Sequence, residues 1–302
     1  MSIKVLVTGG AGFIGSNVCQ RLVNKGHEVI CLDNLSTGYK KNMLEFMYNP
    51  LFHFIIHDIT EPFPAANVDA VIHCATPDLK DPLHFLKTCS YGVFNVAGMA
   101  RRNNAKLICI SGDSIYGTNL ACGSKEEEVA IVSPTDTLCV GHQAMESILS
   151  NYKTLDVRIL RLFNTYGPKM PRNHIIHLLI NDILSKKNLS IPFNPKTVLN
   201  FCFISDILDG ISCTFDLDKF SSPINLASEN QIYLDEFISL VLEESESDCK
   251  VSYISDHKPS EFFKQPNIEK AKKVLHWSQK TNYKTGIKQY IDYLSKGRND
   301  ED

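Results

Sequence analysis

The 302-residue sequence lacks the features that mark several classes of protein. It has no run of about 18 apolar residues, so we expect no membrane span. Its 31 Lys and Arg against 34 Asp and Glu give a formal charge of −3, so it lacks the positive field that would attract nucleic acid. No Cys-x-x-Cys pair occurs among the ten cysteines, so neither a zinc ribbon nor a thioredoxin-like site is supported.

The cysteines and the first residues bear on the compartment. Cys31, Cys74, Cys109 and Cys202 lie inside strongly apolar runs, as small buried hydrophobic residues do. The opening MSIKVLVTGG predicts a strand running into glycines, not a signal peptide. We therefore expect a reduced, cytoplasmic protein.

Short apolar runs alternate with helical patterns through the first half of the chain. The runs are apolar almost throughout, as expected for a parallel sheet covered on both faces. With 43% hydrophobic residues the chain can bury a large core. The pattern predicts an α/β fold with a doubly wound parallel (Rossmann) sheet. The predicted strands are 3–8, 28–33, 53–57, 69–75, 106–111 and 157–163, and the predicted crossover helices are 14–25, 84–103 and 140–153.

The alternation weakens after about residue 165. We expect a Rossmann domain over 1–165 and a smaller C-terminal α/β substrate-type lobe over 166–302, with an interleaved boundary. This lobe should pack at the carboxyl ends of the sheet strands, where open α/β sheets bind ligands. Its predicted helices are 174–186, 205–217, 233–244 and 283–295, around short strands near 200–204 and 223–227.

A glycine-rich turn follows the first predicted strand. Gly9, Gly12 and Gly15 have the spacing of a tight turn that opens a helix. Without Cβ atoms the backbone can approach a pyrophosphate, and the helix N-terminus supplies N–H donors and a positive dipole end. Asp33, at the end of the second predicted strand, can accept hydrogen bonds from an adenosine ribose and would repel a 2′-phosphate, which favours NAD over NADP. The alternative is a relic loop that binds no dinucleotide.

Longer segments carry a resemblance to a known family. They are TGGAGFIGS at 8–16, LDNLSTG at 32–38, HDIT at 57–60, VIHCA at 71–75, SIYG at 114–117 and RLFNTYGP at 161–168. In them the chain resembles the extended short-chain dehydrogenase/reductases (NAD-dependent epimerase/dehydratase family) that act on nucleotide sugars. The UDP-glucuronate decarboxylases (UDP-xylose synthases) are the most similar branch, supported by CFISDILDG at 202–210, PINLAS at 223–228 and QPNIEKAKKVLHW at 265–277.

The resemblance implies a set of cofactor-site residues. Asp58 and Ile59 would flank the adenine, while Cys74, Ala75 and Thr76 would lie near the pyrophosphate and the nicotinamide ribose. Ordinary strand core is the alternative for Ile59 and Cys74. The remaining residues that would line the cofactor are Phe13, Ile14, Asn34, Thr37 and Gly38.

The chain departs from the family at its catalytic positions. The family uses a Ser/Thr, a Tyr and a Lys four residues after the Tyr; the Tyr must lose its proton near neutral pH, although it ordinarily titrates near 10, and the cation favours that ionised form. Counting from Tyr116 and Glu146 places Gly112, Leu138 and His142 at these positions. Among them only His142 could titrate usefully, and a helix-surface residue is the alternative for it.

Positions on the substrate side differ as well. Leu199 stands where the family has an Arg that holds the nucleotide diphosphate, and Cys89 stands where it has an Asn. His174 and His177 lie three residues apart without an evident third ligand, so we expect no metal. The remaining substrate-side candidates are Lys87, Asn164, Lys169, Arg172 and Lys264, whose cations have an ordinary exposed surface role as the alternative.

Three functions remain open at this point. The glycine turn together with the missing catalytic set favours an NAD-binding pseudoenzyme that acts as a scaffold, sensor or regulatory subunit. The second is a nucleotide-sugar enzyme with rebuilt catalytic residues, working through a 4-keto intermediate as a UDP-glucuronate decarboxylase does. The third is an interaction protein without a cofactor. The resemblance also implies a UDP-sugar ligand and a homodimer formed by a helix bundle, with Ile148 and Leu149 as apolar candidates on the helix at 140–153. Ordinary core packing is the alternative for these two residues.

Overall fold

The fold is seen in a computed structural model that describes most of the chain. It covers residues 2–63, 66–117, 124–128, 133, 135–215, 217, 223–254 and 266–299. Lys264, one of the predicted substrate-side residues, lies outside the described residues.

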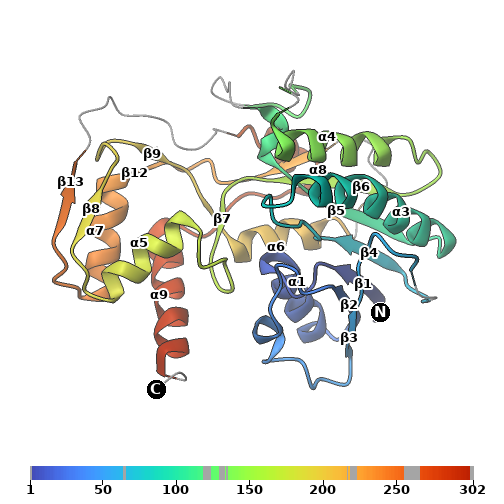
Figure 1. The fold of residues 1–302 in the computed structure, drawn as a ribbon, viewed down its shortest axis with the longest axis horizontal. Coiled ribbons are helices and arrows are strands. Elements are labelled where there is room, and N and C mark those ends of the chain that lie inside the picture. Colours follow the sequence, from blue (N-terminus) through green and yellow to red (C-terminus); the bar gives the residue numbers. More distant parts are fainter. Residues whose placement is uncertain are drawn as a thin grey trace.

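A seven-stranded sheet forms the centre of the molecule (Figure 1). Its order is β11-β6-β5-β4-β1-β2-β3, and all its strand pairs are parallel. Because the order runs outward in both directions from β1 and β4, the sheet is doubly wound, and the predicted fold class is confirmed. The strands are β1 (Lys4–Thr8), β2 (Glu28–Asp33), β3 (Phe52–Ile56), β4 (Ala70–His73), β5 (Lys106–Gly112), β6 (Val157–Leu162) and β11 (Ile224–Leu226).

The continuous apolar runs form strands because both faces of the sheet are covered. In β1, Val5 and Val7 belong to one buried cluster and Leu6 belongs to another, as the alternation of side chains along a strand requires. On one face lie α1 (Phe13–Asn24) and α6 (Ile204–Cys213), and on the other lie α3 (Val93–Arg102) and α4 (Thr137–Ser150) (Figure 1).

The helix predicted over 84–103 is interrupted. It consists of α2 (Pro82–Lys87), a π-helical turn over Thr88–Gly92, and α3. Asp81 caps its start by accepting a hydrogen bond from the backbone N–H of His84 at 3.0 Å, with Pro82 as the first helical residue. Two short 3₁₀ turns, over Lys40–Met43 and Asp113–Tyr116, follow β2 and β5.

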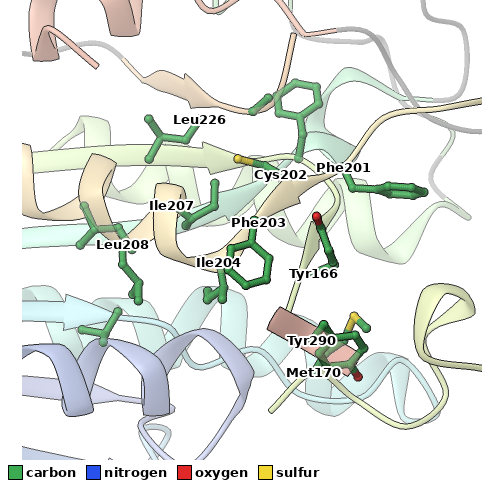
Figure 2. Close-up of a cluster of buried hydrophobic side chains, with 14 of the residues drawn as sticks. Tyr166, Met170, Phe201, Cys202, Phe203, Ile204, Ile207, Leu208, Leu226 and Tyr290 are labelled. Atoms are coloured by element: carbon green, nitrogen blue, oxygen red, sulfur yellow. The ribbon is translucent and has the colours of Figure 1, made fainter. Parts of the chain in front are cut away.

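The second lobe is built from helices and three small strand pairs. Figure 2 shows part of the apolar cluster that this lobe shares with α6 and β11. In this cluster the ring of Tyr166 lies 6.0 Å from that of Phe201 and 5.2 Å from that of Phe203. The helices are α5 (Ile175–Leu184), α7 (Leu234–Ser245) and α9 (Tyr283–Asn299), whereas α8 (Glu269–Leu275) packs against β11 and α6 beside the central sheet (Figure 1). The strand pairs are β7 (Thr165–Tyr166) with β10 (Cys202–Phe203), β9 (Val198–Leu199) with β12 (Ile232–Tyr233), and β8 (Leu189–Ile191) with β13 (Val251–Tyr253).

One strand expected in the smaller lobe lies elsewhere. The segment predicted over 223–227 forms β11, which pairs in parallel with β6 at the edge of the central sheet. Its three residues are all fully buried, so contacts made by the folded sheet decide where this short apolar segment lies. The division of the chain at 165/166 stays a prediction.

Candidate functional site

A cavity of about 300 Å³ opens at the carboxyl ends of β1, β2 and β4. Its size and its place agree with the ligand crevice of an open α/β sheet. Nearly all the residues expected around a dinucleotide line it: Gly9, Gly12, Phe13, Ile14, Gly15, Asp33, Asn34, Thr37, Asp58, Ile59, Cys74, Ala75 and Thr76.

The turn from β1 into α1 is shaped by the absence of side chains. Gly9 has φ +70°, and a Cβ atom there would lie 2.6 Å from the Cα atom of Ala75. A Cβ atom on Gly15 would collide with the carbonyl oxygen of Gly9. Gly12 is the N-cap of α1 and offers no side-chain acceptor to the first helical N–H groups. The turn therefore leaves backbone donors and space for a phosphate group, which is what a dinucleotide requires.

Asp33 is fixed at the rim of this turn. Its carboxylate accepts hydrogen bonds from the backbone N–H of Ala11 at 2.9 Å and of Leu35 at 2.8 Å. The side chain is buried yet lines the cavity. Gly38, also predicted here, does not line the cavity; a Cβ atom on it would lie 2.9 Å from Oδ1 of Asp33, so this glycine makes room for the carboxylate.

Asp58 and Asn34 form a second polar pair in the cavity wall. Nδ2 of Asn34 donates to Asp58 at 2.9 Å, and the backbone N–H of Thr60 donates to the same carboxylate at 2.8 Å. Partial burial opposes ionisation of Asp58, but these hydrogen bonds outweigh it and hold its pKa below the ordinary value. The pair therefore presents a negative oxygen next to Ile59, at the end of the cavity expected to take the adenine.

The sequence analysis missed several lining residues. His84 and Thr88 lie four apart in α2 and the π-helical turn, a helical spacing that could have signalled a shared face. Pro171 has no local signal, because it comes from a segment far along the chain from the glycine turn. The complete set of missed residues is Leu32, Ser36, His57, Pro77, His84, Thr88, Ile110 and Pro171.

The three positions predicted to be degenerate lie at the carboxyl end of β5 and in the first half of α4, and none of them lines the cavity. His142 is 8% exposed, and its Nδ1 atom shares a hydrogen bond of 2.6 Å with Oγ of Ser114. Burial lowers the pKa of His142 to about 4, against the opposing effect of Glu146. The helix-surface interpretation of His142 is wrong, because the imidazole is a buried, neutral group. Leu138 is half-buried one helical turn earlier.

A network of buried polar groups lies behind these positions. Arg161 donates through Nη1 to Oη of Tyr116 at 2.9 Å, and this hydroxyl donates to Asn225 at 2.6 Å. Burial raises the pKa of Tyr116 to about 12, although Arg161 opposes the shift. Tyr116 is thus held protonated in a structural role.

The substrate-side candidates do not converge on one place. Lys87 is exposed on α2, and Arg172 is exposed next to Pro171. Lys169 donates to Oε1 of Gln20 at 2.8 Å and lies 5.0 Å from the ring centre of Phe46; burial lowers its pKa to about 8. Asn164 is half-buried, and its Nδ2 atom has no hydrogen-bond partner among the described residues.

The two histidines considered as metal ligands have structural partners. His174 caps the start of α5 through a hydrogen bond from the N–H of Ile176 at 3.3 Å, and His177 shares one of 2.6 Å with Tyr290. Across the part of the chain that the structure describes, no three His, Cys, Asp or Glu side chains gather as a metal site would need.

The family is decided by sequence. The profile of the NAD dependent epimerase/dehydratase family matches residues 5–227, which spans the glycine turn, the cavity and β11. The chain belongs to this family. NAD, expected from the glycine turn and Asp33, is confirmed as the cofactor type on which the family depends. The predicted resemblance is confirmed with it.

Among curated proteins, UDP-glucuronic acid decarboxylases are similar to this chain. UDP-glucuronic acid decarboxylase 6 from Arabidopsis thaliana is 30% identical over 300 residues, covering 95% of this chain and 87% of that protein. UDP-glucuronic acid decarboxylase 1 from the same plant is 28% identical over 316 residues, covering 99% of this chain and 72% of that protein.

Solved structures share the fold at lower identity. UDP-glucose 4-epimerase from Thermotoga maritima, solved with UDP-glucose, has a TM-score of 0.84 at 22% identity, covering 98% of this chain and 99% of that one. UDP-glucuronic acid 4-epimerase from Bacillus cereus, solved with UDP-glucuronic acid and NAD, has a TM-score of 0.82 at 24% identity, covering 97% and 99%. Within the described residues, no helix is both long and apolar enough to cross a membrane.

Proposed function

We propose that this family member binds NAD without carrying out the family's hydrogen transfer, and that it acts as a cofactor-binding scaffold, sensor or regulatory subunit. The observation that carries the proposal is the contrast between two neighbouring places. The glycine turn and Asp33 keep the space and the donors that a dinucleotide needs. The positions expected to move a proton hold Gly112, Leu138 and a neutral His142.

Particular residues would hold the cofactor. The backbone around Gly12 and Gly15 would face the pyrophosphate, Asp33 would accept from the adenosine ribose, and Asp58 with Ile59 would border the adenine. NAD supplies a hydride acceptor when it is bound. The chain itself would orient the dinucleotide through these polar groups and exclude water where Phe13, Ile14 and Ile59 line the cavity.

Proton transfer is the step for which this chain is poorly equipped. A leucine has no titratable group, and a glycine has no hydroxyl to polarise a sugar oxygen. Tyr116 does not replace the missing phenol, because its hydroxyl already donates to Asn225 and its pKa is raised to about 12. A base poised near neutral pH is what this chemistry needs.

One observation favours a second candidate, a nucleotide-sugar enzyme with rebuilt chemistry. The imidazole of His142 and the hydroxyl of Ser114 are 2.6 Å apart, a distance at which a base can take a hydroxyl proton. The family and the similar decarboxylases make a UDP-sugar the ligand class to test for this candidate.

Two measurements on the purified chain test the proposal. In the first, NAD is titrated while thermal unfolding is followed; binding should stabilise the fold by about 2.7 kcal/mol at a hundredfold excess over Kd. In the second, NAD and UDP-glucuronate are supplied together, and carbon dioxide and a 4-keto sugar are sought; we expect neither. No stabilisation at millimolar NAD would favour an interaction protein without cofactor. Turnover that His142→Ala abolishes would favour the rebuilt enzyme.

A homodimer through α3 and α4 is proposed as part of this function. Tyr91 and Phe94 are 50% and 55% exposed with stacked rings 6.5 Å apart, and Tyr152 lies 6.5 Å from Phe94. A cluster of aromatic rings of which two are exposed and one, Tyr152, is half-buried is typical of an interface. Leu149 is wrong as an interface candidate, because it is 1% exposed and packs in its own chain's core.

Light scattering tests the dimer. Phe94→Glu should halve the molar mass, because it places a charge at the centre of the aromatic cluster. Leu178→Glu, at a residue on α5 that is 43% exposed, is the matched control and should leave the mass unchanged. A monomeric unsubstituted chain would contradict the proposal.

A further inference from the structure

The backbone conformation at position 112 does not require a glycine. Gly112 ends β5 with φ −132° and ψ 167°, an extended conformation that any residue adopts. A side chain at this position is excluded because there is too little space for it. A Cβ atom on Gly112 would lie 2.9 Å from Cε1 and 3.3 Å from Nδ1 of His142.

The imidazole that fills this space cannot easily move aside. Ser114 holds its Nδ1 atom at 2.6 Å, and the ring of Phe85 crosses it at 63° with 6.4 Å between ring centres. Phe85 can come so close to α4 because Gly141 has no side chain: a Cβ atom there would collide with the Phe85 ring and lie 3.1 Å from Sγ of Cys89. His142 is therefore enclosed by Ser114, Phe85 and its own helix, with 8% of its surface exposed.

We propose that His142 is a plug: anchored by Ser114, its imidazole occupies the space in which a side chain at position 112 would stand. Gly112 and His142 are thus one coupled unit, and a hydroxyl-bearing residue is tolerated at 112 only when the imidazole is absent. This inference rests on the proposed function and deepens it. It explains the absence of a hydroxyl at the carboxyl end of β5 as a packing consequence of the histidine. It also predicts that His142 must be replaced before a larger residue is tolerated at position 112.

A double-mutant cycle on thermal unfolding, run without NAD, tests the plug. Gly112→Ser in the unsubstituted chain should lower Tm by about 4 °C or more, since a buried overlap must be relieved by backbone movement. In the His142→Ala background the same Gly112→Ser change should alter Tm by no more than about 1 °C, because the vacated space accepts the serine. Gly98→Ser on α3, where an added Cβ atom would meet only the end of Arg102 at 3.6 Å, is the matched control for adding a serine.

The cycle gives a result even if Gly112→Ser fails to fold, because the comparison of His142→Ala with His142→Ala/Gly112→Ser stands by itself. A second variant, Ser114→Ala, releases the ring from its anchor and should reduce the penalty of Gly112→Ser. Equal penalties for Gly112→Ser in both backgrounds, or no penalty in either, would overturn the plug. These outcomes are independent of NAD binding and turnover, so the plug and the proposed function can fail separately.

Discussion

Arg161 on β6 and Glu146 on α4 form a buried ion pair with two contacts. Nε of Arg161 donates to Oε1 of Glu146 at 3.0 Å and Nη2 donates to Oε2 at 2.7 Å, while Oγ of Ser111 donates to Oε1 at 2.7 Å. Through Glu146, α4, which carries Leu138 and His142, is thus hydrogen-bonded to Ser111 of β5 and to Arg161 of β6. The orientation of these two residues is therefore set by the sheet and not only by their own helix.

Breaking this ion pair should be costly. Glu146→Gln leaves the guanidinium of Arg161 buried without a full counter-charge, and we expect a loss of about 3–5 kcal/mol in the free energy of unfolding. Urea denaturation measures it. Glu229→Gln removes an exposed partner of Lys272 and should lower the free energy of unfolding far less. Similar losses for the two variants would show that Arg161 and Glu146 contribute no more than a surface pair.

NAD binding should depend on the glycine turn. Gly15→Ala places a methyl group against the carbonyl of Gly9 and distorts the turn, so we expect the NAD-induced rise in Tm to disappear. Asp33→Asn keeps the size of the side chain and should weaken NAD binding at least tenfold by removing the charged acceptor for the ribose. Thermal unfolding with and without NAD measures the first effect, and calorimetric titration measures the second. Gly98→Ala on α3, where an added Cβ atom would make only an ordinary contact with the end of Arg102, is the control and should bind NAD like the unsubstituted chain.

Stability should fall in acid partly through His142. Its pKa is about 4 in the folded protein against an ordinary 6.5, so the folded state binds protons less readily than the unfolded chain. The stabilisation is complete above pH 6.5 and is lost as the pH falls through 4. His142→Gln keeps a polar group near Ser114 without titrating, and should reduce the fall in unfolding free energy between pH 6.5 and 4 by on the order of 3 kcal/mol.

The comparison for this pH effect is an exposed residue that does not titrate. Leu83→Gln, at a side chain that is 81% exposed, changes no titratable group and should leave the slope of stability against pH unchanged. Urea denaturation at several pH values measures each slope. An unchanged slope for His142→Gln would mean that its ring already takes up protons in the folded state.

Hydrogen transfer to NAD should be restored only when all three family residues are introduced together. Gly112→Thr, Leu138→Tyr and His142→Lys together remove the plug, return a phenol and return the cation that favours its ionised form. We expect a 4-keto sugar from NAD and UDP-glucuronate with the triple variant and none with Gly112→Thr alone. A triple variant that folds and binds NAD but forms no product would show that a substrate contact, such as one lost at Leu199, also limits the reaction.

The central sheet and the glycine turn could be predicted because their signals are local. Uninterrupted apolar runs define β1, β2 and β5, and the spacing of Gly9, Gly12 and Gly15 specifies a turn whose geometry depends on the absence of Cβ atoms. Most of the cavity lining follows from these elements, since parallel strands end at one edge of the sheet.

The parts that escaped prediction depend on contacts between distant segments. The three residues of β11 resemble any short apolar run, and only the exposed edge of β6 decides that they join the central sheet. The contact between Gly112 and His142 spans thirty positions, so the sequence shows two separate substitutions where the fold has one packed unit. Pro171 enters the cavity wall in the same way, through tertiary packing.

The position of β11 has a practical consequence for dissecting the molecule. A fragment that stops near residue 165 would retain the glycine turn but would leave the backbone N–H and C=O groups along β6 without their neighbour. Other chains can pair with such an unpaired edge strand, so the shortened protein would be prone to aggregate. A minimal fragment for coenzyme binding should therefore extend at least to Leu226, the last residue of β11.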